Sequence, residues 1–128
     1  MARILIAEDE AHIVRVMSLW LTRHGHEVFE TPDGARALEV FRRESIDLII
    51  SDMNMPEMDG YELAKTVRDE LHSDVPFMLL TARCDQETMS ARLKPLNVHL
   101  YPKPFTPSRL VAQIDLLLGV GAKEDAVL

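Results

Sequence analysis

The sequence has a single cysteine, no long hydrophobic run and a shortage of basic residues, and each of these excludes a class of protein. Cys84 alone can form neither an internal disulfide nor a four-cysteine zinc site, which suits a reducing cytoplasm. No apolar run approaches the roughly 18 residues of a membrane span, and the apolar stretch near the start is too short for a signal peptide. With 14 basic against 21 acidic residues, the net charge of −7 disfavours nucleic acid as a direct partner, because phosphate backbones attract clustered lysine and arginine.

The length and apolar content of the chain indicate one globular domain. Its 128 residues fall near the common domain size, and a hydrophobic content of 47% argues against intrinsic disorder. We expect the domain to span residues 1–118. Residues 119–128 contain no complete helical stripe, so they are expected to form a flexible tail or the start of a linker.

Five short apolar runs are separated by segments with helical periodicity. The first, third and fourth runs are almost continuously apolar, as in strands buried on both faces, whereas the second is short and predicts an edge strand. Strict alternation predicts an α/β fold of the (βα)5 type, a doubly wound five-stranded parallel sheet with helices on both faces. The predicted strands are Ile4–Ala7, Val28–Phe29, Ile46–Ile50, Val75–Leu80 and Val98–Tyr101.

The predicted helices carry start and stop signals. Gly25 should end the first helix near His24, and Pro95 should end the fourth near Lys94. The second to fifth helices are predicted to begin after the caps Asp33, Asp59, Asp85 and Thr106, with Glu62 completing a capping box and Pro107 in the first turn of the last helix.

Polar side chains follow four of the five predicted strands. Glu8 and Asp9 come directly after the first strand, Asp52 closely follows the third, Thr81 follows the fourth, and Lys103 comes just after the fifth. Ligands of an open parallel sheet bind outside the carboxyl ends of its strands. We therefore expect these groups to share one crevice.

Three carboxylates in one crevice repel one another, and a divalent cation resolves that conflict. Hard oxygen ligands with open positions favour Mg²⁺ or Mn²⁺. Lys103 supplies a point charge for an anion and Thr81 a hydroxyl donor, so the set holds the groups needed for phosphoryl transfer. Asp52 is the best candidate nucleophile, because the third strand is central and the other two acids form a pair suited to a metal.

Four short motifs lie at the ends of the predicted strands. They are Ile4–Glu10, Ser51–Gly60 (SDMNMPEMDG), Leu80–Ala82 and Lys103–Phe105. As a group they closely resemble the receiver domain of two-component response regulators, and the resemblance covers roughly residues 2–118. It implies a flavodoxin-like fold with strand order 2-1-3-4-5.

The resemblance also implies a role for each polar residue at this edge. Asp52 would accept a phosphoryl group from a phosphohistidine, and Thr81 and Lys103 would bind the phosphoryl oxygens. The Lys103–Pro104 peptide bond would be cis, as is usual at this turn in receivers. The implied ligands of Mg²⁺ are Glu8, Asp9, Asp52 and the main-chain carbonyl of Asn54.

The partners that the resemblance implies are other signalling proteins. A histidine kinase or a histidine phosphotransfer protein would supply the phosphoryl group, and an output protein would contact the fourth helix, fifth strand and fifth helix. The chain would act in the cytoplasm as a monomer or weak dimer, without binding nucleic acid or membranes itself. It would be either a stand-alone regulator or a receiver cut from a longer protein.

One position differs from the usual receiver pattern. The residue three before the lysine is usually aromatic there, but here it is Leu100, and Tyr101 follows it. Neighbouring strand residues face opposite ways, so Tyr101 cannot simply replace the usual ring. We expect Leu100 to stay buried while Thr81 signals through the loop after the fourth strand and the short fourth helix.

Two other functions fit parts of the sequence. A Mg²⁺-dependent phosphohydrolase would use the same acids, although no cap insertion or general acid accompanies them. A phosphorylation-independent interaction module would keep the fold alone, which the complete acidic, hydroxyl and lysine set argues against. The histidines, including His26, show no metal-ligand spacing and are expected to lie on the surface.

Overall fold

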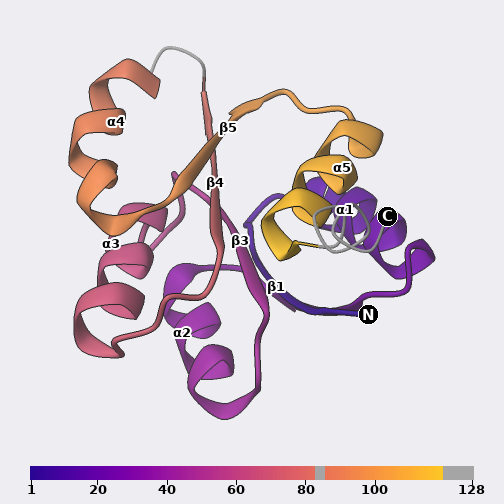
Figure 1. Cartoon of the computed structure of the whole chain (residues 1–128), viewed down its shortest axis with the longest axis horizontal. Coiled ribbons are helices and arrows are strands. Elements are labelled where there is room, and N and C mark those ends of the chain that lie inside the picture. The colour runs from indigo at the N-terminus through magenta and orange to yellow at the C-terminus, as the bar shows by residue number, and fades with distance from the viewer. Residues whose placement is uncertain (83–85, 120–128) are drawn as a thin grey trace.

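A computed structural model, which describes residues 1–82 and 86–119, shows strands and helices alternating along the chain (Figure 1). The third helix continues as a π-helical turn over Thr66–Glu70, and the fourth continues as a 3-10 turn over Lys94–Leu96. The elements are β1 (Arg3–Ala7), α1 (Ala11–Arg23), β2 (Glu27–Thr31), α2 (Gly34–Arg43), β3 (Leu48–Asp52), α3 (Gly60–Lys65), β4 (Phe77–Ala82), α4 (Gln86–Leu93), β5 (His99–Lys103) and α5 (Pro107–Leu118).

The five strands form one parallel sheet in the order β2-β1-β3-β4-β5. Helices α1 and α5 cover one face of the sheet, and α2, α3 and α4 cover the other (Figure 1). The predicted (βα)5 architecture and the strand order implied by the family resemblance are both confirmed. Within the described ranges, no helix has the length and apolar character that crossing a membrane would need.

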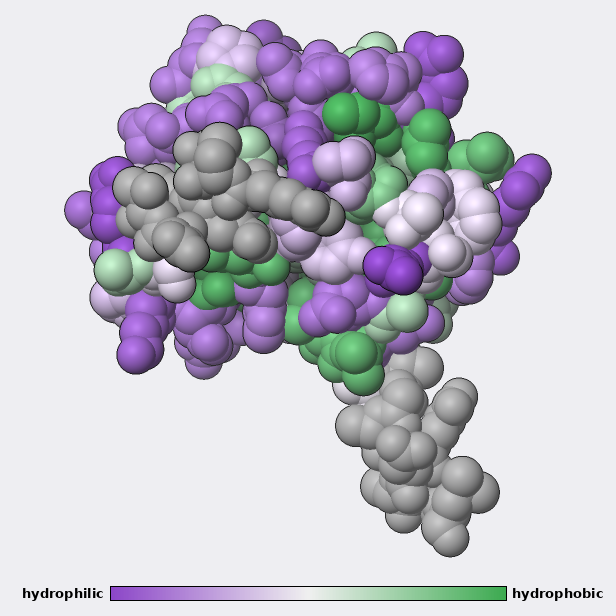
Figure 2. Space-filling model, turned by 90° about the horizontal axis from the view of Figure 1, so that it is seen from above, coloured by the Kyte–Doolittle hydropathy of each residue, from purple (hydrophilic) through white to green (hydrophobic). Residues whose placement is uncertain are grey.

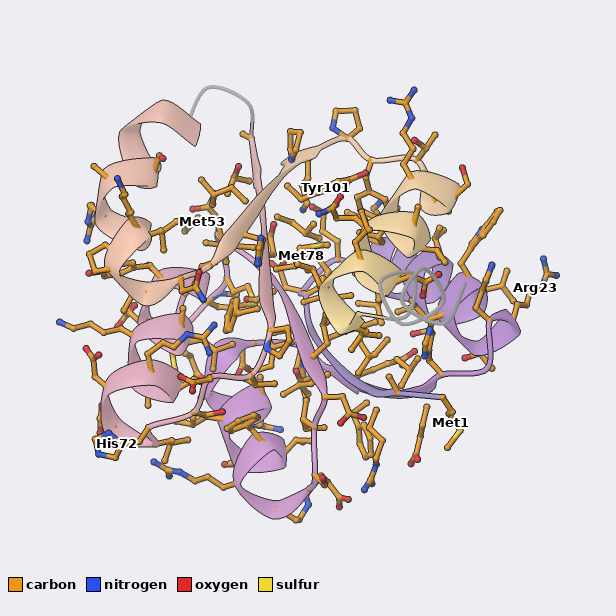
Figure 3. All side chains as sticks on the ribbon, viewed as in Figure 1. Met1, Arg23, Met53, His72, Met78 and Tyr101 are labelled. Atoms are coloured by element: carbon orange, nitrogen blue, oxygen red, sulfur yellow. The ribbon has the colours of Figure 1, made fainter. Side chains whose placement is uncertain are left out.

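The core consists of two clusters, one on each side of the sheet. Alternate residues of the central strands supply both clusters, and the side chains of β1, β3 and β4 are almost entirely buried. Met53 lies on the side of α3 and α4, whereas Met78 lies toward α5 (Figure 3). Burial on both faces is the reason these strands have nearly continuous apolar sequences.

Strands β3, β4 and β5 extend further toward their carboxyl ends than their apolar runs predict. Asp52, Thr81 and Lys103 are strand residues, not residues that follow a strand. Asp52 pairs with Leu80, and Thr81 pairs with Pro102. Backbone pairing continues past the apolar side chains because the ladder depends on neighbouring strands rather than on side-chain polarity.

Most of the predicted helix ends are present. The Asp33 side chain accepts a hydrogen bond from the first turn of α2, and Asp59 and Glu62 form a complete capping box. Thr106 occupies the N-cap position of α5, but its side chain makes no capping hydrogen bond. The predicted cap at Asp85 lies outside the described residues.

The surface position expected for His26 is wrong. His26 is buried, and its Nδ1 accepts a hydrogen bond from the Ala2 backbone N–H at 3.1 Å. Its Nε2 lies 3.8 Å from Asp115 Oδ1 on α5. The residue lies directly before β2, where the starts of two strands and α5 meet, so tertiary packing covers it. Burial lowers the pKa of His26 from 6.5.

Candidate functional site

Four strands bring polar groups to one edge of the sheet. Glu8 and Asp9 follow β1 directly, Asp52 ends β3, Thr81 lies near the end of β4, and Lys103 ends β5. The strands are parallel and in register, so their carboxyl ends meet at the same edge. The structure thus brings together the carboxylates and lysine that the sequence placed at strand ends.

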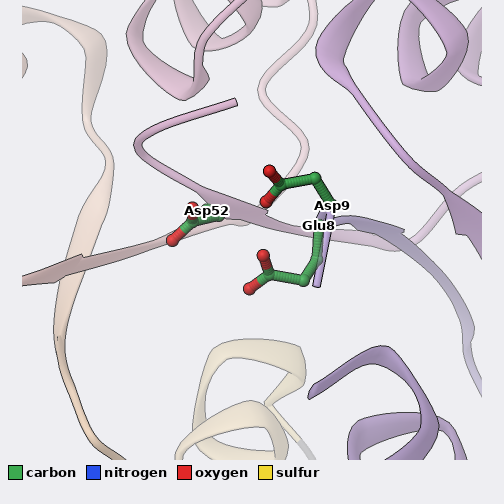
Figure 4. Close-up of side chains that lie close together, drawn as sticks. All are labelled: Glu8, Asp9 and Asp52. Carbon is green, nitrogen blue, oxygen red and sulfur yellow. The ribbon is translucent and has the colours of Figure 1, made fainter. Parts of the chain in front are cut away.

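Three carboxylates converge at this edge. One oxygen from each of Glu8, Asp9 and Asp52 can be chosen so that all three lie within 4.8 Å of one another. The close-up in Figure 4 shows the side chains directed into a common space. Glu8 and Asp52 are buried, whereas Asp9 is exposed, so the cluster has one side open to solvent.

Lys103 partly neutralises this cluster. Its Nζ lies 2.8 Å from Asp52 Oδ1 and 3.1 Å from Glu8 Oε1. Burial lowers the pKa of Lys103, but its hydrogen bonds to Asp52 and Glu8 and their charges outweigh burial and raise it. Lys103 therefore stays charged between the two buried acids.

One lysine does not compensate for both buried carboxylates. Burial, followed by the charge of Asp52, raises the pKa of Glu8 from 4.5 to about 7, although Lys103 opposes the rise. Burial also raises the pKa of Asp52, against the opposing effect of Lys103 and of a backbone hydrogen bond from Asn54. Such a cluster of hard oxygen ligands with one open side fits Mg²⁺ or Mn²⁺, which would favour the ionised form of each carboxyl.

Thr81 supplies a hydroxyl at the same edge. It is 1% exposed, and its Oγ1 has no hydrogen-bond partner among the described residues. A buried hydroxyl without a partner is costly in a folded protein, and such groups are often found at functional sites. The hydroxyl is free to bond an anionic oxygen that enters the crevice.

The loop after β3 contains Asn54, the fourth metal ligand that the family resemblance implies. Asn54 is exposed and lies two residues after Asp52. The loop returns to α3 at Gly60, where an added Cβ would lie 2.4 Å from the Asp52 carbonyl oxygen. Only glycine permits this close approach, so the loop begins and ends against the same strand. The role of the Asn54 carbonyl stays a prediction.

Leu100 and Tyr101 face opposite sides of β5. Leu100 packs against the cluster on the α2–α4 side, and Tyr101 packs against the cluster that includes α5 residues (Figure 3). Both side chains are only partly buried, so the prediction that Leu100 is buried is wrong. Because β5 is an edge strand, fewer neighbours cover its side chains. The Lys103–Pro104 peptide bond is cis.

An apolar groove that the sequence did not indicate lies beside Lys103. The groove has a volume of about 530 Å³ and runs between α1 and the turn into α5. Ile13, Val16, Phe105 and Pro107 form most of its apolar lining. Viewed onto this edge, more hydrophobic surface lies over α1 and α5 than over the other half (Figure 2). The sequence offered no signal for this groove, because Val16 follows the apolar periodicity of α1 and only the structure shows that it is exposed.

Comparisons with known proteins agree with the fold and the motifs. A family model described as "Response regulator receiver domain" matches residues 4–115. The chain is 34% identical over 127 residues to a "Chemotaxis protein CheY homolog" of Campylobacter jejuni, covering 97% of this chain and 98% of that protein. It is 37% identical over 116 residues to a "Probable transcriptional regulator ycf27" of Porphyridium aerugineum, covering 91% of this chain and 48% of that protein.

The first curated relatives are longer than this chain, which spans about half of their length. Among solved structures, the chemotaxis response regulator CheY4 of Vibrio cholerae superimposes with a TM-score of 0.83 at 32% identity. That match covers 91% of this chain and 98% of the solved chain. With the family model covering most of its length, the chain belongs to the response regulator receiver domains.

Proposed function

We propose that Asp52 accepts a phosphoryl group from a histidine kinase or a histidine phosphotransfer protein, and that this event switches protein–protein contacts. The observation that carries the proposal is the cluster of Glu8, Asp9 and Asp52 with the Lys103 ammonium 2.8 Å from Asp52 Oδ1. Receiver domains are signalling switches, and this chain retains the acids, hydroxyl and lysine that phosphoryl transfer requires.

The proposed step is an in-line displacement at phosphorus. A carboxylate oxygen of Asp52 forms the new P–O bond, the P–N bond of phosphohistidine breaks, and the imidazole nitrogen keeps the electron pair. The carboxylate must be ionised to attack, and the Lys103 ammonium beside it favours that form. After transfer, Lys103 would bond a phosphoryl oxygen, and the unpartnered Thr81 hydroxyl would donate to another.

Mg²⁺ would be held by Glu8, Asp9, Asp52 and the Asn54 carbonyl, and it would neutralise charge on the transferred group. The chain's own residues bind and orient the reacting groups. Buried Glu8 sets one wall of the crevice and hydrogen-bonds Lys103 at 3.1 Å, which holds the ammonium at the edge of the sheet. The exposed Asp9 leaves the other side open for the donor protein.

The proposed output surface consists of α4, β5 and α5. Thr81 is the second-last residue of β4, and the chain continues from there to α4, so engagement of its hydroxyl would be transmitted in that direction. Among the described side chains of α4 and the turn after it, Leu93 and Leu96 are buried and anchor them to the core. The sequence of α4 contains only two large apolar residues, Met89 and Leu93, so a shift of this helix would disturb little apolar packing. We place the switch in the cytoplasm, with no separate substrate.

Incubation with acetyl phosphate and Mg²⁺ tests the proposal. Intact-mass analysis should show the addition of one phosphoryl group, and peptide mapping should place it on Asp52. Asp52→Asn and excess chelator should each abolish the addition. Asp9→Ala should abolish the response to Mg²⁺, and unchanged Mg²⁺ binding by that variant would remove Asp9 from the ligand set.

The alternative functions predict other results. Continuous turnover of simple phosphate esters by the wild type would favour a phosphohydrolase. A phosphorylation-independent interaction module would show no added mass, and partner binding would be the same with and without the phosphodonor.

A further inference from the structure

Gly34, the first residue of α2, makes a hydrogen bond outside its own helix. Its backbone N–H donates to the Met58 carbonyl oxygen at 3.2 Å. The first N–H groups of a helix have no partner within the helix and must find one elsewhere. The Asp33 side chain satisfies a different one, the Arg36 N–H, at 2.8 Å. The Met58 carbonyl is therefore a structural part of the start of α2.

The contact at Gly34 leaves no space for a side chain. A Cβ atom there would lie 2.5 Å from the Met58 carbonyl oxygen and 2.9 Å from Met58 Cγ. These distances fall about 1 Å short of ordinary van der Waals contact. Gly34 is not among the residues with positive φ, so close approach, rather than backbone conformation, requires glycine at this position.

Met58 belongs to the loop of residues 53–59, which follows Asp52. The base of this loop is fixed, because Met53 N–H donates to the Leu80 carbonyl and Gly60 N–H donates to the Met53 carbonyl, each at 2.9 Å. The rest of the loop folds back on itself: Met58 N–H donates to the Pro56 carbonyl at 2.8 Å, and Glu57 has a φ of 65°. The contact with Gly34 holds this second half against α2.

We propose that Gly34 is a positioning residue for the phosphoacceptor loop. By seating Met58 against α2, it fixes the second half of the loop, and through it the backbone around Asn54 beside the Asp52 carboxylate. The inference rests on the proposed function, in which the Asn54 carbonyl is a metal ligand. A displacement of about 1 Å at Met58 would move the loop beyond the tolerance of a positioned site, which is about 0.5 Å.

The variant Gly34→Ala tests the proposal. Loss of an outer contact that orients metal ligands lowers metal affinity by about 10–100-fold, and we expect that range for Mg²⁺. The rate of phosphorylation by acetyl phosphate at limiting Mg²⁺ should fall with it. Phe41→Ala is the matched control, because Phe41 packs partly buried on the same helix, about 10 Å along the axis from Gly34. It should destabilise the fold and leave Mg²⁺ affinity unchanged. Wild-type Mg²⁺ affinity in Gly34→Ala would overturn the proposal.

The double variant Gly34→Ala/Met58→Ala separates the backbone contact from the side-chain contact. It removes Met58 Cγ but keeps the carbonyl oxygen 2.5 Å from the new Cβ. We expect it to stay as impaired as Gly34→Ala. Full recovery would show that the Met58 side chain, not the backbone of the loop, caused the effect, which contradicts the proposal.

Amide hydrogen exchange supplies a measurement in the wild type, which remains available if Gly34→Ala does not fold. Saturating Mg²⁺ should slow exchange of the Gly34 amide, since its acceptor lies on the loop that the ion orders. An unchanged Gly34 amide would overturn the proposal. If the wild type failed to accept a phosphoryl group, the proposed function would be contradicted instead. Amide exchange across residues 53–59 would still decide whether Gly34 fixes the loop, because exchange there should be faster in Gly34→Ala than in the wild type.

Discussion

Replacing Glu8 with glutamine should stabilise the metal-free protein at alkaline pH. Glu8 is 1% exposed, and burial with the charge of Asp52 raises its pKa from 4.5 to about 7. A carboxyl whose pKa is raised by folding binds more protons in the folded state, so stability falls as pH rises from 4.5 to about 7. Glutamine keeps the size of the side chain and a carbonyl acceptor but carries no charge.

The expected magnitude follows from the pKa. Raising it from 4.5 to about 7 costs about 3 kcal/mol of folding free energy above pH 7, at about 1.4 kcal/mol per pH unit. Part of that gain is lost, because glutamine gives the Lys103 ammonium a weaker partner than the carboxylate at 3.1 Å. We therefore expect Glu8→Gln to be more stable than the wild type by about 2 kcal/mol at pH 8, and by close to nothing at pH 4.5.

Urea unfolding in the presence of chelator, monitored by circular dichroism from pH 4.5 to 8, measures this difference. The same titrations with saturating Mg²⁺ should stabilise the wild type and leave Glu8→Gln nearly unaffected, because ligand binding to the folded state adds stability. A difference between the two proteins that stays constant with pH would refute the reasoning, since it would mean that Glu8 titrates as an ordinary carboxyl.

Three further predictions follow from single side chains. Beryllofluoride, a phosphoryl mimic, should change amide exchange in α4 of the wild type, and Lys103→Ala should abolish that change. The Mg²⁺ affinity measured by calorimetry should change only slightly, because the main partner of the ammonium in the switched state is the phosphoryl group. An unaltered α4 response in the variant would exclude this role of Lys103. Leu100→Ala should lower the free energy of unfolding, measured in urea, by about 1–2 kcal/mol, which is less than for a fully buried leucine because Leu100 is only partly buried. The variant should keep the α4 response to beryllofluoride. If beryllofluoride instead changed amide exchange at residues 100–101 alone, Tyr101 would be the moving group. The pKa of His26 in the folded protein lies below 6.5, so its contribution to the free energy of unfolding is complete above pH 6.5. That contribution is lost as the pH falls toward the folded pKa, by at most about 1.4 kcal/mol per pH unit. His26→Asn should remove this slope, and parallel curves of stability against pH for the two proteins would contradict the prediction.

The local order of the chain could be predicted from its sequence. Continuous apolar runs mark strands that are covered on both faces, and the predicted helix caps at Asp33 and Asp59 are present because capping depends on residues only three positions apart. Alternation of strands and helices determines a parallel sheet, and a parallel sheet places its strand ends at one edge. The meeting of Glu8, Asp9, Asp52 and Lys103 follows from that geometry and was predictable.

Other features depend on contacts between distant segments. His26 is buried because β1, β2 and α5 meet around it, and no residue near it in sequence indicates this. Gly34 touches Met58, 24 residues later, and the close approach exists only when α2 and the loop after β3 share one side of the sheet. The degree of burial of Leu100 depends on its place in an edge strand.

The pKa of Glu8 is likewise a property of the folded chain. That the acids would gather could be predicted from the sequence, because the alternation of strands and helices and the position of each acid at a strand end are both visible along the chain. The depth at which each acid is buried, and the oxygens that Lys103 contacts, depend instead on the packing of the whole domain. Burial and charge interactions change over a few ångströms, and such distances are fixed only when all five strands and their loops are packed together.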